Sequence, residues 1–359
     1  MTKPTILVDG HVLDGKPQGT CAYIAGLYGE IARQGCARVL MATAREESLA
    51  RWFPDASAVE WVPLRSSNKF ARLGMEFDQL TARWRPDFAH FQYVTPFRKR
   101  SKWIVTVHDL LFLDAPQYFP WRYRMQNHAL FRMSSLRADV VLTVSEYSRD
   151  AICRHFGIDR SRIHVTYNAP DRFFRAEDMM IDGLSSGRFI VYVSRFEPRK
   201  NQHALVQAFR DLAAELPEYF RLVLVGYPAL AYPALDEALR QGGNRVTVLT
   251  NLSHAQLTWL YRHAAASIYP SNAEGFGMPV IEAVAAGGIS YCADNTAMHE
   301  LVPYVHGSFD GSNPSELRDT IRRAAAGSDT GARVETQARM KRTFSWASSG
   351  EALMKALHA

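Results

Sequence analysis

Residues 271–288, SNAEGFGMPVIEAVAAGG, decide the fold class because they join a predicted strand to a helix through a glycine-rich loop. The strand is the apolar run at 266–271, and Pro279 suits the first helical turn because its missing N–H would have no partner there. Gly275 and Gly277 allow the backbone to approach a ligand closely. A strand, a glycine loop and a helix N-terminus in this order present backbone N–H groups to an anion.

Two carboxylates flank this loop. Glu274 lies in it, and Glu282 is expected near the end of the first helical turn, facing the loop. The helix dipole favours a carboxylate there, so capping and ligand binding are equal alternatives for Glu282 taken singly. Capping does not account for Glu274, the glycines and the proline together. Each carboxylate can accept hydrogen bonds from a pair of hydroxyl groups, and a sugar nucleotide offers such pairs on its hexose and on its ribose.

Working outward from this stretch, short apolar runs alternate with helical patterns along the whole chain. The predicted strands of the first half are 5–10, 37–43, 87–93, 102–109, 138–145 and 163–169. Those of the second half are 188–195, 220–227, 245–251, 266–271 and 288–294. Helical patterns lie between them at 20–35, 145–157, 201–217 and 253–265. This alternation predicts parallel sheets with both faces covered by helices.

Length and composition favour two soluble domains. A chain of 359 residues exceeds one typical core, and its 47% hydrophobic and 22% charged content is that of a globular protein. The polar break at 177–188 predicts the linker between the domains, whose ligands are expected at the carboxyl ends of the strands and in the cleft between domains. The N-terminus predicts a strand rather than a signal peptide, and no apolar run is long enough to span a bilayer. Four scattered cysteines without a CxxC pair favour a reducing cytoplasm.

The net charge of +6 is unevenly distributed, because residues 1–170 carry +7 and residues 171–359 carry −1. Basic clusters lie at Arg65/Lys69/Arg72, at Arg83/Arg85 and at 98–102. They are either a solvated surface or an attraction to something anionic, such as a phospholipid surface or a phosphorylated acceptor. No nucleic acid partner is expected, since no helix-turn-helix, RNP-like or zinc pattern accompanies the charge.

Two further clusters of charged or titratable residues follow predicted strands. Arg195 and Lys200 in VSRFEPRKNQ (193–202), together with Arg199, bring cations to a helix start, where they are unfavourable unless an anion lies nearby. Surface charge offset by Glu197 is the alternative explanation. His108 and Asp109 end another predicted strand, where sites of α/β proteins form. A histidine with a purely structural role is about as common at such a position as a functional one.

A glycine loop at 14–27 opens the first helix but lacks the GxGxxG pattern of dinucleotide oxidoreductases. The sequence also lacks GxxxxGK[ST], HExxH and a paired-acid metal motif. These absences disfavour P-loop, metalloprotease and metal-dependent transferase functions, so no metal site is expected.

The combination resembles the retaining family-four glycosyltransferases of the GT-B fold. EGFGMPVIEA (274–283) is similar to their E-x7-E signature, and SRFEPRKNQHALVQAF (194–209) to their R-x4-K segment. Further similar segments are GTCAYIAGLYGEI (19–31), VHDLLF (107–112), VSEYSRDAI (144–152), VTYNAPD (165–171) and the terminal FSWASSGEALMKAL (344–357). The resemblance implies an α/β protein with two Rossmann-like, doubly wound parallel-sheet domains facing a central cleft.

The resemblance also implies a division of the chain. Residues 1–176 would form the acceptor-binding domain, with a terminal helix at 343–359 packing back on it, and residues 177–342 would bind the nucleotide sugar. Arg195 and Lys200 would neutralise the diphosphate, Glu274 would hold the donor sugar and Glu282 the ribose. The remaining implied contacts are Gly19 in the donor site, the backbone N–H groups of Phe276, Gly277 and Met278, and His108 on the sugar side of the cleft.

The EPRKN segment resembles bacterial mannosyltransferases that build O-antigen and other surface polysaccharides. The implied activity is metal-independent hexosyl transfer with retention, without a cofactor, with GDP-mannose as the first-choice donor and a glycan or lipid-linked glycan as acceptor. The protein would be cytoplasmic and peripheral on the inner face of the cytoplasmic membrane. A UDP-sugar donor and a catalytically idle scaffold subunit are alternatives. An epimerase acting on UDP-N-acetylglucosamine is a third, but it does not predict the EGFGMP loop.

Overall fold

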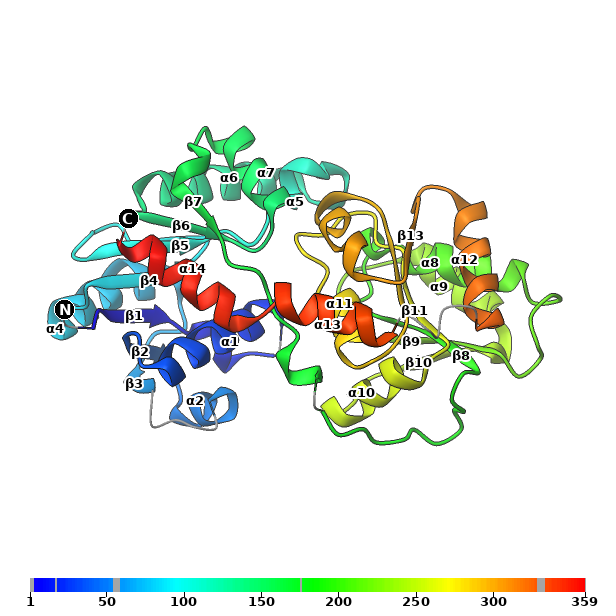
Figure 1. Cartoon of the computed structure of the whole chain (residues 1–359). Helices are drawn as coiled ribbons and strands as arrows, with labels where there is room; N and C mark the ends of the chain where they lie inside the picture. Colours follow the sequence, from blue (N-terminus) through cyan, green and yellow to red (C-terminus); the bar gives the residue numbers. More distant parts are fainter. Residues whose placement is uncertain (1–2, 17, 54–58, 175, 328–332, 359) are drawn as a thin grey trace. The chain divides into compact units, whose positions relative to one another are not determined.

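The computed structural model describes residues 3–16, 18–53, 59–174, 176–327 and 333–358 (Figure 1). Pro17 of the predicted glycine loop and Ala359 of the predicted terminal helix lie outside the described residues. The chain divides into two compact units, a first unit of Met1–Ala169 with Ser345–Ala359 and a second unit of Pro170–Phe344. The division after Ala169 lies seven residues before the boundary expected from the sequence.

The first unit is built on a sheet of seven parallel strands in the order β3-β2-β1-β4-β5-β6-β7. The strands are β1 Thr5–Asp9, β2 Arg38–Thr43, β3 Val59–Pro63, β4 Phe88–Gln92, β5 Lys102–Thr106, β6 Val140–Thr143 and β7 Ile163–Val165. Its helices are α1 Gly19–Gln34, α2 Glu46–Trp52, α3 Lys69–Ala71, α4 Phe77–Trp84, α5 Leu111–Asp114, α6 Trp121–Arg137, α7 Glu146–Phe156 and α14 Trp346–His358. A π-helical turn, Arg72–Glu76, connects α3 to α4.

The second unit is built on a sheet of six parallel strands in the order β10-β9-β8-β11-β12-β13. The strands are β8 Phe189–Val193, β9 Arg221–Val225, β10 Val246–Leu249, β11 Ala266–Tyr269, β12 Ser290–Ala293 and β13 Gly307–Phe309. Its helices are α8 Gln202–Asp211, α9 Pro233–Gln241, α10 His254–His263, α11 Met278–Ala285, α12 Pro314–Ala326 and α13 Arg333–Thr343. Strands covered on both faces bury nearly every side chain, as the fully buried Ile6, Leu7 and Val8 of β1 illustrate. Among the helices described here, none has the length and apolarity needed to cross a bilayer.

Each sheet has one point where the strand order reverses. In the first sheet β1 lies between β2 and β4, and in the second β8 lies between β9 and β11. The loops that leave the carboxyl ends of β1 and β4, or of β8 and β11, run to opposite faces, which opens a crevice where doubly wound sheets bind ligands. The fold therefore predicts one ligand position at β1/β4 and another at β8/β11.

Helix α14 returns the end of the chain to the first unit, where it packs against α1. The contact is close because Gly26 of α1 faces the indole of Trp346, and a Cβ at Gly26 would lie 2.0 Å from Cε2 of that ring. The Oγ of Ser349 donates a hydrogen bond of 2.7 Å to the carbonyl oxygen of Tyr167. Glycine at position 26 thus permits the two helices to meet.

Gly26→Ala is expected to lower the free energy of unfolding by about 1–2 kcal/mol, because strain against the rigid indole outweighs the gain in helix propensity. Gly29→Ala in the same helix is the matched control, since its Cβ would lie 3.8 Å from the ring of Phe53, at ordinary contact distance. Urea titration of both variants measures the difference. Equal stability of the two would show that the α1–α14 contact does not depend on Gly26.

Candidate functional site

The turn after β8 brings three cations and a carboxylate together at the reversal point of the second sheet. Residues Pro198–Lys200 form a single 3-10 turn, and Asn201, with φ of 58°, links that turn to α8. Asparagine tolerates this left-handed conformation better than most residues do. The hydroxyl of Tyr192 donates to the carbonyl oxygen of Lys200 at 2.7 Å, which fixes the backbone of the turn.

The loop after β11 brings Glu274 to the same place. Its backbone N–H donates to Oγ1 of Thr296 at 3.0 Å. Gly277 then caps α11 with φ of 105°, a left-handed conformation that favours glycine. A Cβ at Gly277 would also lie 3.0 Å from Cδ1 of Leu301. Met278 is the first residue of α11, and Phe276 and Gly277 lead into it. The contacts predicted for their N–H groups stay predictions.

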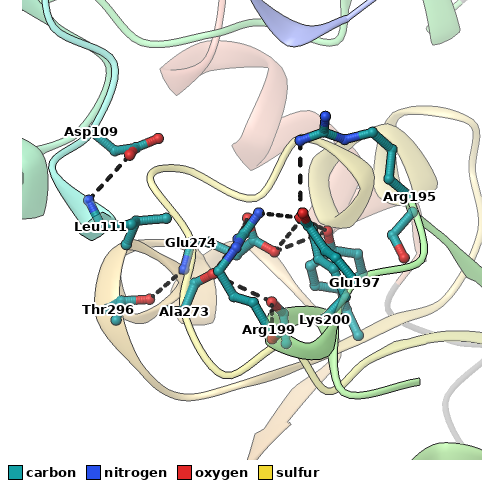
Figure 2. A network of polar contacts seen from close by, with 12 residues as sticks. Asp109, Leu111, Arg195, Glu197, Arg199, Lys200, Ala273, Glu274 and Thr296 are labelled. Atoms are coloured by element: carbon teal, nitrogen blue, oxygen red, sulfur yellow. Dashed lines mark hydrogen bonds and ion pairs between the residues drawn. The ribbon is translucent and has the colours of Figure 1, made fainter. Parts of the chain in front are cut away.

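A buried cluster of charges connects the two loops (Figure 2). The Nζ of Lys200 lies 2.6 Å from Oε1 of Glu274, and Nη1 of Arg199 lies 3.0 Å from its Oε2. Arg199 also contacts Glu197 through Nη2 at 2.6 Å. The hydroxyl of Tyr269 donates to Oε1 of Glu274 at 3.1 Å. The cluster formed by Arg195, Glu197, Arg199, Lys200 and Glu274 is called the charge cluster below, and its formal charge is +1.

The electrostatics of the charge cluster keep Glu274 ionised. Burial opposes ionisation, but attraction by Lys200 and Arg199 outweighs it and lowers the pKa of Glu274 to about 2. Burial lowers the pKa of Lys200 against the attraction of Glu274. Two of the three ammonium hydrogens of Lys200 have acceptors, Glu274 and the hydroxyl of Tyr269, so one remains for a ligand.

Arg195 differs from the other members of the charge cluster. Its side chain is 52% exposed, and its contact with Oε1 of Glu197 is 3.9 Å long, whereas Arg199 and Lys200 are each 11% exposed and form short pairs. The carbonyl oxygen of Arg195 accepts a hydrogen bond of 2.8 Å from Nε2 of Gln202, which fixes its backbone. The guanidinium therefore keeps most of its hydrogen-bonding capacity for an anion.

Sequence reasoning missed how much of the charge cluster is paired internally. It treated Glu197 as an offset for surface charge, yet Glu197 is 7% exposed and binds Arg199. It also did not include Tyr269, which contacts both Lys200 and Glu274. A tyrosine at the end of a strand and a Glu-x-Arg spacing are too common to reveal this pairing in advance.

The expected position of Glu282 needs a correction. Helix α11 begins at Met278, so Glu282 is its fifth residue and lies beyond the first turn, where the dipole argument for a cap does not apply. The hydroxyl of Tyr261 donates to Oε2 of Glu282 at 3.1 Å. Burial raises the pKa of Glu282 to about 7, although Tyr261 and Arg172 act in the opposite direction. This carboxyl group can therefore change its protonation near neutral pH.

A cavity of about 370 Å³ lies in the first unit at the predicted reversal point. Its wall includes Asp9 and Gln92 at the carboxyl ends of β1 and β4, and Asp109 just beyond β5. Arg72 contacts Oδ2 of Asp9 at 3.3 Å and is 5% exposed, which corrects its expected place in a basic surface cluster. The aromatic residues of the wall are Tyr93, Phe112, Phe119, Tyr123 and Phe131.

His108 and Gly19 both lie in the first unit. Nε2 of His108 contacts Oε1 of Gln92 at 2.7 Å, and burial lowers the pKa of His108 to about 4, so its ring is neutral at pH 7. Gln92 lines the cavity and His108 does not. Gly19 is the first residue of α1, between Gln18 and Thr20 of the cavity wall. Their predicted contacts with a donor stay predictions.

The chemistry available in the described residues is that of charges and hydrogen bonds. No group of three or more His, Cys, Asp or Glu side chains placed to hold a metal ion is found among these residues. The four cysteines are free, with Cys21 and Cys292 buried. The charge cluster can bind an anion through Arg195 and Lys200. The carboxylates of Glu274 and Glu282 can accept hydrogen bonds from hydroxyl groups.

Comparison with known proteins gives two family matches that together span most of the chain. Residues 18–172 match the family described as Glycosyltransferase Family 4, and residues 177–341 match Glycosyl transferases group 1. O-antigen chain mannosyltransferase B of Escherichia coli is 31% identical over 209 residues, 55% of each chain. O-antigen chain mannosyltransferase RfbU of Salmonella typhimurium is 28% identical over 204 residues, 55% of this chain and 54% of the relative. The matches thus span about half the length of these curated relatives.

A solved structure with a similar fold is that of HepE from Anabaena in complex with UDP-glucose. It has a TM-score of 0.73 and 18% sequence identity, and the alignment covers 99% of both chains. At this identity the likeness concerns the fold, which is the two-domain GT-B arrangement of Rossmann-like units. The chain belongs to the GT-B glycosyltransferases whose first and second domains the two family matches describe.

Proposed function

We propose that this protein transfers a hexose from a sugar nucleotide, with GDP-mannose as first choice, to a glycan or lipid-linked glycan in bacterial surface-polysaccharide synthesis. The observation that carries the proposal is the charge cluster at the β8/β11 reversal point, where Arg195 and Lys200 retain donors for an anion. Family membership supports glycosyl transfer, and the names of the two O-antigen relatives support mannose.

The polar groups at this site of the second unit have separate parts in the proposal. Arg195 and Lys200 neutralise the diphosphate, and backbone N–H groups at the start of α11 contact its oxygens. Glu274 accepts a hydroxyl of the hexose. Glu282 accepts hydrogen bonds from the ribose hydroxyls.

The proposed reaction keeps the anomeric configuration of the sugar and needs no metal. The bond between C1 of the hexose and the phosphate oxygen breaks, and the acceptor hydroxyl oxygen bonds to C1 from the same face. The proton of that hydroxyl goes to the departing phosphate oxygen. Negative charge develops on the diphosphate, so preorganised cations supply most of the acceleration.

The cavity of the first unit is the proposed acceptor site. Aromatic faces such as Tyr93, Phe119 and Tyr123 offer apolar surface to the C–H faces of a sugar ring, while Asp109 and Asn127 offer hydrogen bonds to its hydroxyls. A mixed lining of this kind suits a saccharide better than a purely apolar ligand. The cavity also lies at the reversal point of its own sheet, as the charge cluster does.

A donor assay tests the proposal. The purified protein is incubated with GDP-mannose, UDP-glucose or UDP-N-acetylglucosamine, each with and without a mannose disaccharide acceptor and with EDTA, and nucleotide release is measured. Acceptor-dependent release of GDP that persists in EDTA is expected. Release of UDP alone would establish a UDP-sugar donor, and binding without turnover would favour an idle scaffold. Activity abolished by EDTA and restored by manganese would refute metal independence.

The affinity for GDP-mannose is expected to fall about tenfold between pH 8 and pH 6, because ribose binding needs the ionised form of a carboxyl whose pKa is about 7. The sign follows from proton release: a ligand that selects the carboxylate binds better as the pH rises through that pKa. GDP-mannose is the right ligand because its phosphates do not titrate in this range, unlike the terminal phosphate of GDP. Calorimetric titration at both pH values should show the dependence, and Glu282→Gln should remove it.

A further inference from the structure

Helix α6 buries Phe131 in the core but presents several of its other apolar residues to solvent. Its exposed residues include Trp121, Met125, Met133 and Leu136, with exposed fractions of 67%, 63%, 36% and 39%. The side of α6 toward the sheet carries Ser134 and Ser135, which are fully buried. A surface helix normally shows the opposite arrangement, so this pattern indicates a partner outside the chain.

The exposed side of α6 is also basic. The helix contains Arg122, Arg124, Arg132 and Arg137 and no acidic residue. The guanidinium of Arg122 lies 5.6 Å from the ring centre of Trp121. We name the exposed set Trp121, Arg122, Met125, Arg132, Met133 and Leu136 the α6 face.

The loop between β4 and β5 extends the α6 face. Nη2 of Arg137 donates to the carbonyl oxygen of Phe97 at 2.8 Å, and Phe97 is 62% exposed. The neighbouring basic run at 98–102, which the sequence singled out, is partly neutralised by two carboxylates. Asp78 pairs with Arg98 and Arg100, and Asp139 pairs with Lys99. Helix α6, in contrast, carries four arginines and contains no acidic residue to offset them.

We propose that the α6 face docks the protein on an anionic lipid bilayer. Tryptophan, methionine and leucine enter the boundary between headgroups and acyl chains, and arginines between them bind lipid phosphates. The 17-residue helix is about 25 Å long, enough to lie along the membrane plane. A second copy of the chain fits poorly, because a two-fold contact would oppose two acid-free basic helices.

Docking by α6 would bring the acceptor cavity to the membrane surface. The same helix supplies Tyr123, Asn127 and Phe131 to the cavity wall. Its other side carries Trp121 and Met125, so one helix separates the proposed bilayer contact from the cavity. An acceptor carried on a lipid would then meet the cavity without leaving the bilayer. Docking itself does not depend on the identity of the donor sugar.

Sedimentation with vesicles tests the proposal in the full-length protein. Wild type is expected to bind vesicles of phosphatidylcholine mixed with phosphatidylglycerol. Binding to vesicles of phosphatidylcholine alone should be much weaker, and binding to the mixed vesicles should weaken as the salt concentration rises. Trp121→Ser/Met125→Ser and Arg122→Gln/Arg132→Gln should each reduce the partition coefficient about tenfold or more. The control Met179→Ser/Met180→Ser removes two methionines of the second unit that are 56% and 64% exposed, and should bind as wild type does.

Two further measurements separate docking from folding and from self-association. The α6 variants should keep the wild-type melting temperature and the wild-type transfer rate to a soluble acceptor, because none of the four residues lines the cavity. Absence of wild-type binding to anionic vesicles at low salt would overturn the proposal. So would variants that bind as wild type does, or a wild-type dimer that Trp121→Ser/Met125→Ser dissociates, which would make a second copy the occupant.

Discussion

Arg195→Ala is expected to lower kcat about a hundredfold, on the order of 3 kcal/mol of transition-state stabilisation, while the melting temperature stays near that of wild type. Turnover falls because the negative charge that develops on the diphosphate loses its most accessible cation. Stability changes little because the side chain is 52% exposed and its 3.9 Å contact with Glu197 is a weak pair. Steady-state release of GDP at saturating acceptor, alongside thermal melting, measures both quantities.

Arg318→Ala is the matched control for Arg195→Ala. Arg318 is an arginine of the same unit in a 3.3 Å pair with Asp211, and its side chain is 32% exposed. It lies on α12 and has no part in the charge cluster, so its removal should leave kcat unchanged. Wild-type turnover in Arg195→Ala would place the diphosphate elsewhere, and an equal loss in Arg318→Ala would show that the effect is not specific to the charge cluster.

Glu274→Gln is expected to lower kcat a hundredfold or more without weakening the binding of GDP. The carboxylate faces the hexose, whose anomeric carbon gains positive charge in the transition state, so its negative charge matters for turnover. GDP has no hexose. Removing the negative charge leaves Lys200 and Arg199 with one fewer carboxylate to neutralise them, which favours a diphosphate nearby. Kinetics and calorimetric titration of GDP should therefore separate the two effects.

Glu274→Gln should also lower the free energy of unfolding, by about 3 kcal/mol, because two buried cations lose a charged partner. Glu215→Gln is the control, since Glu215 forms an exposed pair with Arg322 at 2.7 Å. That variant should keep both stability and turnover. If Glu274→Gln instead loses GDP affinity and turns over normally, Glu274 serves the nucleotide and its assignment to the hexose is wrong.

The sequence predicted those strands and helices whose hydrophobic pattern matches the way they are buried in the fold. The run at 266–271 appears in the structure as β11, and the helix that begins near Pro279 appears as α11, with Glu274 in the loop between them. Strands buried on both faces are continuously apolar, which makes them visible in a sequence. Strands β3, VEWVP, and β13, GSF, were not singled out, because neither is a continuous apolar run.

Helix α6 shows why other parts could not be predicted. Its apolar residues lie on both sides, with Trp121 and Met125 outward and Phe131 inward beside buried serines, so no single apolar stripe indicates the helix. Local patterns fail where a surface serves a partner instead of the core. The pairing of Arg199 with two carboxylates was hidden for a different reason, since Glu197 and Glu274 come from loops 77 residues apart.

Calorimetric titration of GDP-mannose into wild type, Arg195→Ala/Glu282→Gln and Arg318→Ala tests most directly whether the charge cluster and Glu282 bind the donor. The account predicts binding by wild type, a loss of affinity of about a hundredfold or more in the double variant, and wild-type affinity in Arg318→Ala. Equal affinity of the double variant and wild type, or no binding of GDP-mannose by any of the three, would contradict it.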